Sequence, residues 1–180
     1  MAESIEAAKE LALACGFTQV GELDVDTIRV RTEVRDTCAQ NKCRAYGKNW
    51  SCPPGCGTLE ECEKRIRQYR RGLILQTTGK LEDSLDYEGM EQAAIDHSAH
   101  LEDLTKKIRD LYPGCLIIGA GACKRCETCT YPDAPCRFPD KMTFSMEALG
   151  MIVSDVCKDN QLPYYYGPNT LTYVGCVFLD

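Results

Sequence analysis

The sequence predicts an α/β fold: a single compact domain over residues 1–180, in which a mixed sheet with flanking helices presents two cysteine-rich metal loops. Three observations lead to this prediction. A chain of 180 residues, 44% of them hydrophobic, is long enough for one domain with a buried core. Segments with helical periodicity alternate with short apolar segments, as is typical of α/β proteins. Most of the 13 cysteines gather in two segments, at about 35–57 and 121–143, that show neither the periodicity of a helix nor that of a strand.

The N-terminal part of the chain is predicted to form a helix, strands, the first cysteine loop and a second helix. Residues 3–14 place apolar side chains at helical spacing, and Gly16 follows as a candidate C-cap. Residues 17–34 contain an apolar alternation that predicts one or two strands. Residues 35–57 are rich in cysteine, glycine and proline, which favours an ordered loop without helix. A Thr-x-x-Glu capping box then opens a helix over about 58–69.

The central part of the chain has the length of one βαβ unit. Residues 73–78 are a candidate buried strand, and residues 88–111 have the periodicity of a long helix. A second strand is expected over 115–120, after a Pro-Gly pair. The long helix carries His97 and His100, which match no metal motif, so we expect them on a solvated helix face.

The C-terminal part adds the second cysteine loop, a helix and two closing strands. The loop covers 121–143, the helix is expected over about 145–159, and the strands over 164–166 and 171–179. Four further cysteines lie in apolar stretches, where a free cysteine behaves as a small buried hydrophobic side chain. These are Cys15, Cys115, Cys157 and Cys176.

The second loop carries the strongest functional motif in the sequence. Cys123, Cys126 and Cys129 form a C-x2-C-x2-C run, the spacing with which a bacterial ferredoxin holds three corners of a 4Fe–4S cluster. Cys136 follows six residues later, after Pro135, as the candidate fourth ligand. Structural zinc is the alternative, although zinc sites usually take two well-separated C-x2-C pairs. We therefore expect a 4Fe–4S cluster in this loop.

The first loop is a candidate for a second 4Fe–4S cluster, with zinc again as the alternative. Its ligands would be Cys38, Cys43 and Cys52, with Cys56 as the fourth and Cys62 in reserve. Their spacing, C-x4-C-x8-C-x3-C, matches no common zinc pattern. Four cysteine ligands would make a closed cluster for electron transfer. Three would leave one iron open to a small molecule, as catalytic metal sites leave a position open.

At these residues the chain resembles a family of uncharacterised bacterial and archaeal proteins predicted to bind metal. The resemblance spans roughly residues 30–180. It implies a metal-binding, iron–sulfur protein of the kind frequent in anaerobes, and it implies no settled activity. The segments that carry it are Cys38 to Cys43, Tyr46 to Pro54, Cys123 to Cys129, Pro135 to Pro139 and Ser145 to Gly150.

Charge and cysteine usage limit the partners and the compartment. The formal net charge of −6, from 21 basic and 27 acidic residues, argues against a nucleic-acid or anionic-membrane partner. No apolar run approaches the roughly 18 residues that a membrane-spanning helix needs. The N-terminal residues lack the pattern of a signal peptide, so we expect a cytoplasmic protein. In a reducing cytosol, many spaced thiols favour metal binding over disulfides.

These observations favour an iron–sulfur protein with two clusters, acting as an electron carrier or redox accessory with a partner redox protein. A first alternative is a reductase-type enzyme, in which the first cluster has an open iron that binds a small molecule. A second alternative is a structural zinc protein that serves as an interaction module.

Overall fold

The computed structural model describes residues 4–180, whose strands form one five-stranded sheet in the order β1-β2-β5-β3-β4. The strand β5 pairs antiparallel with both β2 and β3, whereas β3 pairs parallel with β4, so the sheet is mixed, as predicted. The strands are β1 (Gln19–Asp24), β2 (Arg71–Lys80), β3 (Leu116–Gly119), β4 (Phe144–Ser145) and β5 (Thr170–Leu179).

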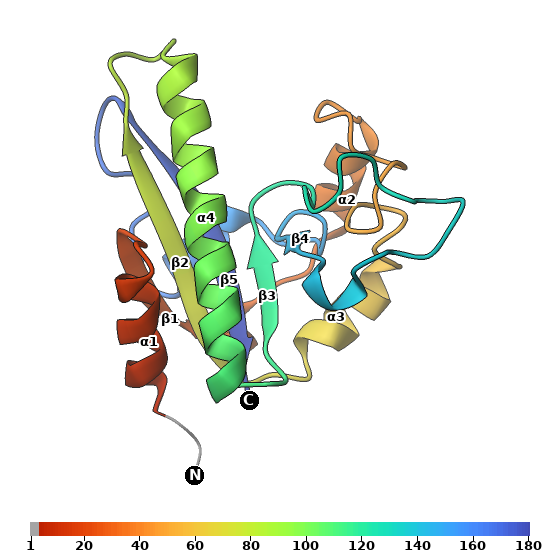
Figure 1. Ribbon diagram of the computed structural model, residues 1–180, viewed down its shortest axis with the longest axis horizontal. Helices are drawn as coiled ribbons and strands as arrows, with labels where there is room; N and C mark the ends of the chain where they lie inside the picture. Colours follow the sequence, from red (N-terminus) through yellow and green to blue (C-terminus); the bar gives the residue numbers. More distant parts are fainter. Residues whose placement is uncertain (1–3) are drawn as a thin grey trace.

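Within the described residues 4–180, five α-helices accompany the sheet, and two short 3-10 turns cover Val25–Thr27 and Pro139–Lys141. In Figure 1, α1 and α4 lie against the sheet, while α2, α3 and the two cysteine loops gather beyond its β4 edge. No helix within residues 4–180 has both the length and the apolar character to cross a bilayer. The helices are α1 (Ile5–Ala14), α2 (Thr32–Ala39), α3 (Leu59–Ile66), α4 (Tyr87–Leu111) and α5 (Val153–Asp159).

Alternation along the central strand β5 divides the core into two clusters, one on each face of the sheet. Val177 and Leu179 pack with α1 and α4, and Cys176 and Phe178 pack with α3 and α5 on the opposite face. All four side chains are fully buried. Successive side chains of a strand point to opposite faces, so a strand covered on both faces is apolar throughout.

The predicted caps fix the helix ends. The side chain of Ser4 accepts a hydrogen bond from the backbone N–H of Ala7, and α1 ends before Gly16, whose φ of +104° favours glycine. The capping box of α3 is complete, because Thr58 and Glu61 each bond the other's backbone N–H. The predicted helix over 3–14 is thus confirmed from residue 5 onward, and its first residue lies outside the described residues.

The segment β2-α4-β3 is a crossover, although its two strands are not neighbours. Both are antiparallel to β5, which lies between them, so β2 and β3 run parallel to each other. The sequence predicts the crossover unit but not that β5 lies between its two strands, because β5 begins about 50 residues after β3 ends.

The helix predicted over 145–159 is wrong in its first half. Ser145 belongs to β4, where it pairs with Gly119 of β3. The chain then turns, the Ser145 hydroxyl accepts the N–H of Ala148, and Gly150 adopts a φ of +82° before α5 begins at Val153. Pairing with β3 therefore overrides the local helical preference of this segment.

Three smaller expectations also need correction. Helix α2 extends to Ala39, so Cys38 lies on a helix instead of a loop. The helix can extend this far because the first proline that could stop it, Pro53, comes much later in the chain. The strand expected over 164–166 is absent, and there the Tyr166 hydroxyl donates to the side chain of Gln76 instead. His97 is not on a solvated helix face, because α4 packs against β2 and β5. Its side chain is buried, with 2% exposure.

Candidate metal centre

The four cysteines of the second loop line one small cavity, which we call the second-loop cavity. It has a volume of about 20 Å³, and Trp50 and Ser51 of the first loop lie in its wall. All four thiols are partly exposed. They are Cys123, Cys126, Cys129 and Cys136. The sequence prediction grouped these four residues, and the structure brings them to the same cavity.

Short hydrogen bonds shape the far part of this loop. The hydroxyl of Thr130 donates to the Pro135 carbonyl at 2.9 Å, and Arg137 Nη1 donates to the Thr128 carbonyl at 2.8 Å. The backbone N–H of Ala134 donates a hydrogen bond to the Thr130 carbonyl at 3.0 Å. These contacts bend the chain back, so that Cys136 reaches the cavity from six residues beyond Cys129.

The first loop contributes three cysteines to a different and larger cavity of about 810 Å³, which we call the first-loop cavity. Cys38 comes from the last turn of α2, Cys43 lies within the turn that the Arg44 N–H closes on the Asn41 carbonyl, and Cys52 is buried near the end of the loop. Apolar side chains of the segment before α5, such as Met151 and Ile152, form much of the remaining wall. A space of this size belongs to the range of small-molecule sites.

The thiols of the first-loop cavity influence one another. Burial raises the pKa of Cys38, and the neighbouring Cys43 adds to this effect. Burial also raises the pKa of Cys52, with smaller contributions from Cys43, Cys38 and Cys123. Without metal the thiols of Cys38 and Cys52 therefore favour the protonated form, and a bound metal would supply the positive charge that deprotonates them.

Cys56 does not join these three thiols. Its side chain is 3% exposed, belongs to the apolar core, and lies 3.5 Å from the carbonyl oxygen of Ala148. Cys62, the reserve ligand, is fully buried beside it, and Arg35 Nη2 donates to its sulfur at 3.1 Å. The structure thus separates both cysteines from the first-loop cavity.

Electrostatics differentiate the two thiols of this buried pair. A hydrogen bond from Cys56, together with the charges of Arg35 and Arg65, lowers the pKa of Cys62. The same hydrogen bond, with burial, raises the pKa of Cys56. Arg35 also donates through both terminal nitrogens to the Gly57 carbonyl at 3.1 Å, so it joins α2 to the end of the first loop.

The two loops contact each other directly. The Ser51 hydroxyl accepts the backbone N–H of Cys123 at 3.0 Å, and the indole N–H of Trp50 donates to the Ala134 carbonyl at 3.0 Å. The Trp50 ring meets that of Tyr131 edge to face, with centroids 4.8 Å apart. The sequence does not reveal the role of Ser51, because its partner lies 72 residues away.

Within residues 4–180, no three side chains of His, Cys, Asp or Glu converge closely enough to hold a single metal ion. The donors present are soft thiols, which suit iron–sulfur clusters and zinc better than magnesium or calcium. The eight predicted ligands therefore divide into four at the second-loop cavity, three at the first-loop cavity, and Cys56 in the core.

Comparison with known proteins agrees with this donor chemistry. A search of curated proteins and a search of solved structures found no match. The sequence profile of a family described as predicted metal-binding protein (DUF2284) matches residues 21–179, which include both cysteine loops. The chain therefore belongs to this family of predicted metal-binding proteins.

Proposed function

We propose that the chain is an iron–sulfur redox enzyme with two 4Fe–4S clusters, one of which has an iron open to a small molecule. Cys123, Cys126, Cys129 and Cys136 would hold the closed cluster. The second cluster would take Cys38, Cys43 and Cys52 as its protein ligands. Bound clusters of this kind supply one-electron transfer at potentials that their surroundings adjust.

One observation carries the choice of an enzyme over an electron carrier. The thiols of Cys38, Cys43 and Cys52 line a cavity of about 810 Å³, whereas the thiol of Cys56 lies in the core. An electron carrier needs no such cavity beside its cluster, and a substrate site does. The apolar part of the wall would exclude water from the open iron.

The contact between the loops supports an electron path between the two sites. Ser51 bonds Cys123 and directly precedes Cys52, so a ligand of each cluster lies within one residue of this contact. In our proposal the second loop receives electrons from a partner redox protein and passes them to the first. Because Cys123, Cys126, Cys129 and Cys136 are partly exposed, a partner could approach them.

Cysteine variants and metal analysis test this proposal. Protein purified without oxygen should contain iron and acid-labile sulfide, and Cys126→Ser and Cys43→Ser should each lose roughly half of the iron, since each removes a ligand of one cluster. Cys56→Ser should keep its iron. Cys15→Ala is the matched control, because Cys15 lies in the core near α1, away from both cavities.

The open iron has a separate test. Cyanide or an added thiol should change the electron paramagnetic resonance spectrum of reduced wild-type protein, and Cys126→Ser should retain this response. Zinc in place of iron and sulfide would refute the proposal and favour a structural zinc module. Loss of iron in Cys56→Ser, with no response to either added ligand, would show that Cys56 is the fourth ligand of the first-loop cluster. Both clusters would then be closed, which would favour an electron carrier over an enzyme.

A further inference from the structure

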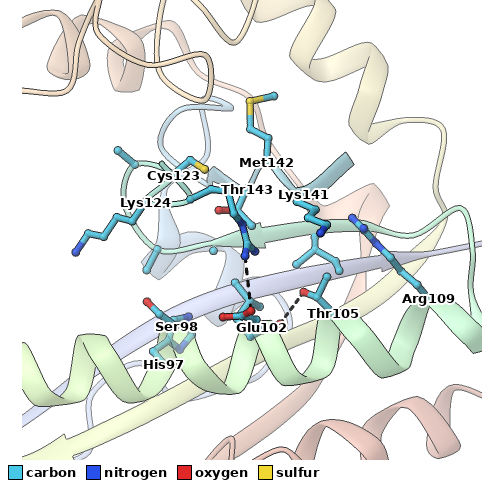
Figure 2. Close-up of a pocket in the computed structure, with 16 residues that line it drawn as sticks. His97, Ser98, Glu102, Thr105, Arg109, Cys123, Lys124, Lys141, Met142 and Thr143 are labelled. Carbon is cyan, nitrogen blue, oxygen red and sulfur yellow. Dashed lines mark hydrogen bonds and ion pairs between the residues drawn. The ribbon is translucent and has the colours of Figure 1, made fainter. Parts of the chain in front are cut away.

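A third cavity lies between α4 and the chain that leaves β3, on the sheet side of the second loop (Figure 2). We call it the basic pocket, and its volume is about 210 Å³. Helix α4 forms one wall, with His97, Ser98 and Arg109 among its side chains. The opposite wall includes Lys124 and Lys141.

Positive charge dominates this pocket, although the chain carries a net charge of −6. Among the described residues, four cationic side chains line it, namely Arg109, Lys124, Arg125 and Lys141, against one carboxylate, that of Glu102. That carboxylate is already engaged, because its oxygen lies 3.6 Å from Arg125 and 3.3 Å from Lys106 outside the pocket.

The three remaining cations have no acidic partner among residues 4–180 within 4 Å. In Figure 2, Arg109 and Lys141 lie toward one end of the pocket and Lys124 toward the other. Neither Arg109 nor Lys141 lines the second-loop cavity, so these two charges do not simply compensate thiolates there. Grouped cations without counter-charges favour an anionic occupant.

A buried histidine offers an uncharged partner to the same occupant. His97 is 2% exposed, and its Nε2 has no hydrogen-bond partner within the described part of the chain. Its Nδ1 lies 3.1 Å from the Thr77 hydroxyl, which lies 3.2 Å from Nδ1 of His100. If Thr77 accepts from His100 and donates to His97, all these atoms are satisfied and His97 Nε2 carries a free N–H.

Burial and the nearby His100 keep His97 uncharged at neutral pH, since they lower its pKa to about 4. A buried imidazole nitrogen without a partner destabilises the folded state, and such groups in native proteins usually meet a water or a ligand. The lack of a side chain at Gly175 leaves space beside this nitrogen, since a Cβ there would lie only 3.3 Å from it.

We propose that the basic pocket binds the oxyanion group, a carboxylate or a phosphate, of a small molecule. Arg109, Lys124 and Lys141 would provide charge-assisted hydrogen bonds to its oxygens, and His97 a neutral contact at the inner end. Lys124 also lines the first-loop cavity, so it lies between the two spaces. Cys123, a predicted ligand of the closed cluster, also lines this pocket, but the anion would bind to the cations and not to the cluster, so the proposal goes beyond the proposed redox function.

Calorimetric titration of the anaerobically purified protein tests this proposal. Inorganic phosphate and succinate are the two anionic probes, and glycerol is the uncharged control. We expect saturable binding at one site for at least one anion and none for glycerol. Lys141→Met and Arg109→Met should each weaken this binding about tenfold or more, because each removes a charge-assisted hydrogen bond. Lys158→Met, which removes an exposed charge from α5 outside the pocket, should leave it unchanged.

The outcomes separate the ligand sources and the two proposals. Tighter binding of phosphate identifies a phosphate site, and tighter binding of succinate identifies a carboxylate site. No saturable binding of either anion, or equal binding by wild type and both pocket variants, overturns the proposal. Iron and sulfide are measured in the same samples. Anion binding without a cluster supports the anion site and refutes the redox function. A cluster without anion binding supports the redox function and refutes the anion site.

Discussion

The hydroxyl of Ser51 accepts the backbone N–H of Cys123 at 3.0 Å, across a sequence separation of 72 residues. Ser51 is 1% exposed and directly precedes Cys52. This contact fixes the start of the second cysteine loop against the end of the first. Each loop therefore depends on the other for its position, although they share no strand or helix.

Ser51→Ala should destabilise the protein by about 1–2 kcal/mol, because it leaves the N–H of Cys123 without its partner in a partly buried place. Chemical denaturation of metal-loaded protein measures this change in the free energy of unfolding. Ser154→Ala is the control, since Ser154 is exposed on α5 and should change stability by less than about 0.5 kcal/mol. Equal effects of the two variants would show that the contact does not hold the loops.

Stability should fall as the pH is lowered from about 6.5 to about 4, because of His97. Burial lowers the pKa of His97 to about 4 in the folded protein, below its ordinary value of 6.5. In this window the unfolded chain binds a proton that the folded chain does not, so protonation favours unfolding. The expected loss is about 3 kcal/mol when the pH reaches the folded-state pKa.

Denaturation at a series of pH values measures this loss, and His97→Phe provides the comparison. Phenylalanine cannot take up a proton and retains an aromatic ring against Phe17, which meets His97 edge to face at 5.6 Å. The variant should show a flatter pH dependence between pH 6.5 and 4, whatever its absolute stability. An unchanged slope would show that His97 does not cause the pH dependence.

The sequence predicts the parts of the fold that local chemistry determines. The capping box at Thr58, the left-handed Gly16 and the apolar pattern of β5 each specify an element from a few neighbouring residues. It does not predict that Ser145 pairs with Gly119, because a two-residue strand has no periodicity and its partner is distant. The helix predicted there followed local propensity, which tertiary pairing overrides.

The candidate site divides in the same way. The C-x2-C-x2-C spacing indicates a local ligand set, and its thiols line a common cavity. The position of Cys56 could not be predicted, because Gly55 allows the chain to turn either way and packing against Ala148 decides the direction. The importance of Arg35 was equally hidden, since its contact with Cys62 depends on how α2 packs against α3.

Arg35→Met should destabilise the protein by about 2–3 kcal/mol, because the guanidinium bonds both the Gly57 carbonyl and the Cys62 sulfur. It should also raise the pKa of Cys62, since the charge of Arg35 is one of the causes that lower it. Arg29→Met removes an exposed arginine just before α2 and is the matched control. Denaturation compares the two variants, and equal stabilities would refute a structural role for Arg35.

Removal of the metal should expose the two cysteine loops to trypsin before the rest of the chain. The loops contain few apolar side chains and no paired strand, so in our proposal metal ligation is what mainly keeps them ordered. Cleavage after a chelator treatment should therefore begin within 35–57 and 121–143. These segments offer trypsin eight sites, at Arg35, Lys42, Arg44, Lys48, Lys124, Arg125, Arg137 and Lys141.

Mass spectrometry of the fragments, with and without chelator, identifies the first cuts. Lys158 provides an internal control, because it lies beside the irregular segment 160–169, which contains no cysteine and should respond little to metal. Hydrogen bonds within the loops, such as Thr130 to Pro135, are local and do not fix a loop to the sheet. If the loop sites stay protected while Lys158 is cut, then the contacts of Ser51 and Trp50 order the loops by themselves, and ligation adds only the metal's chemistry.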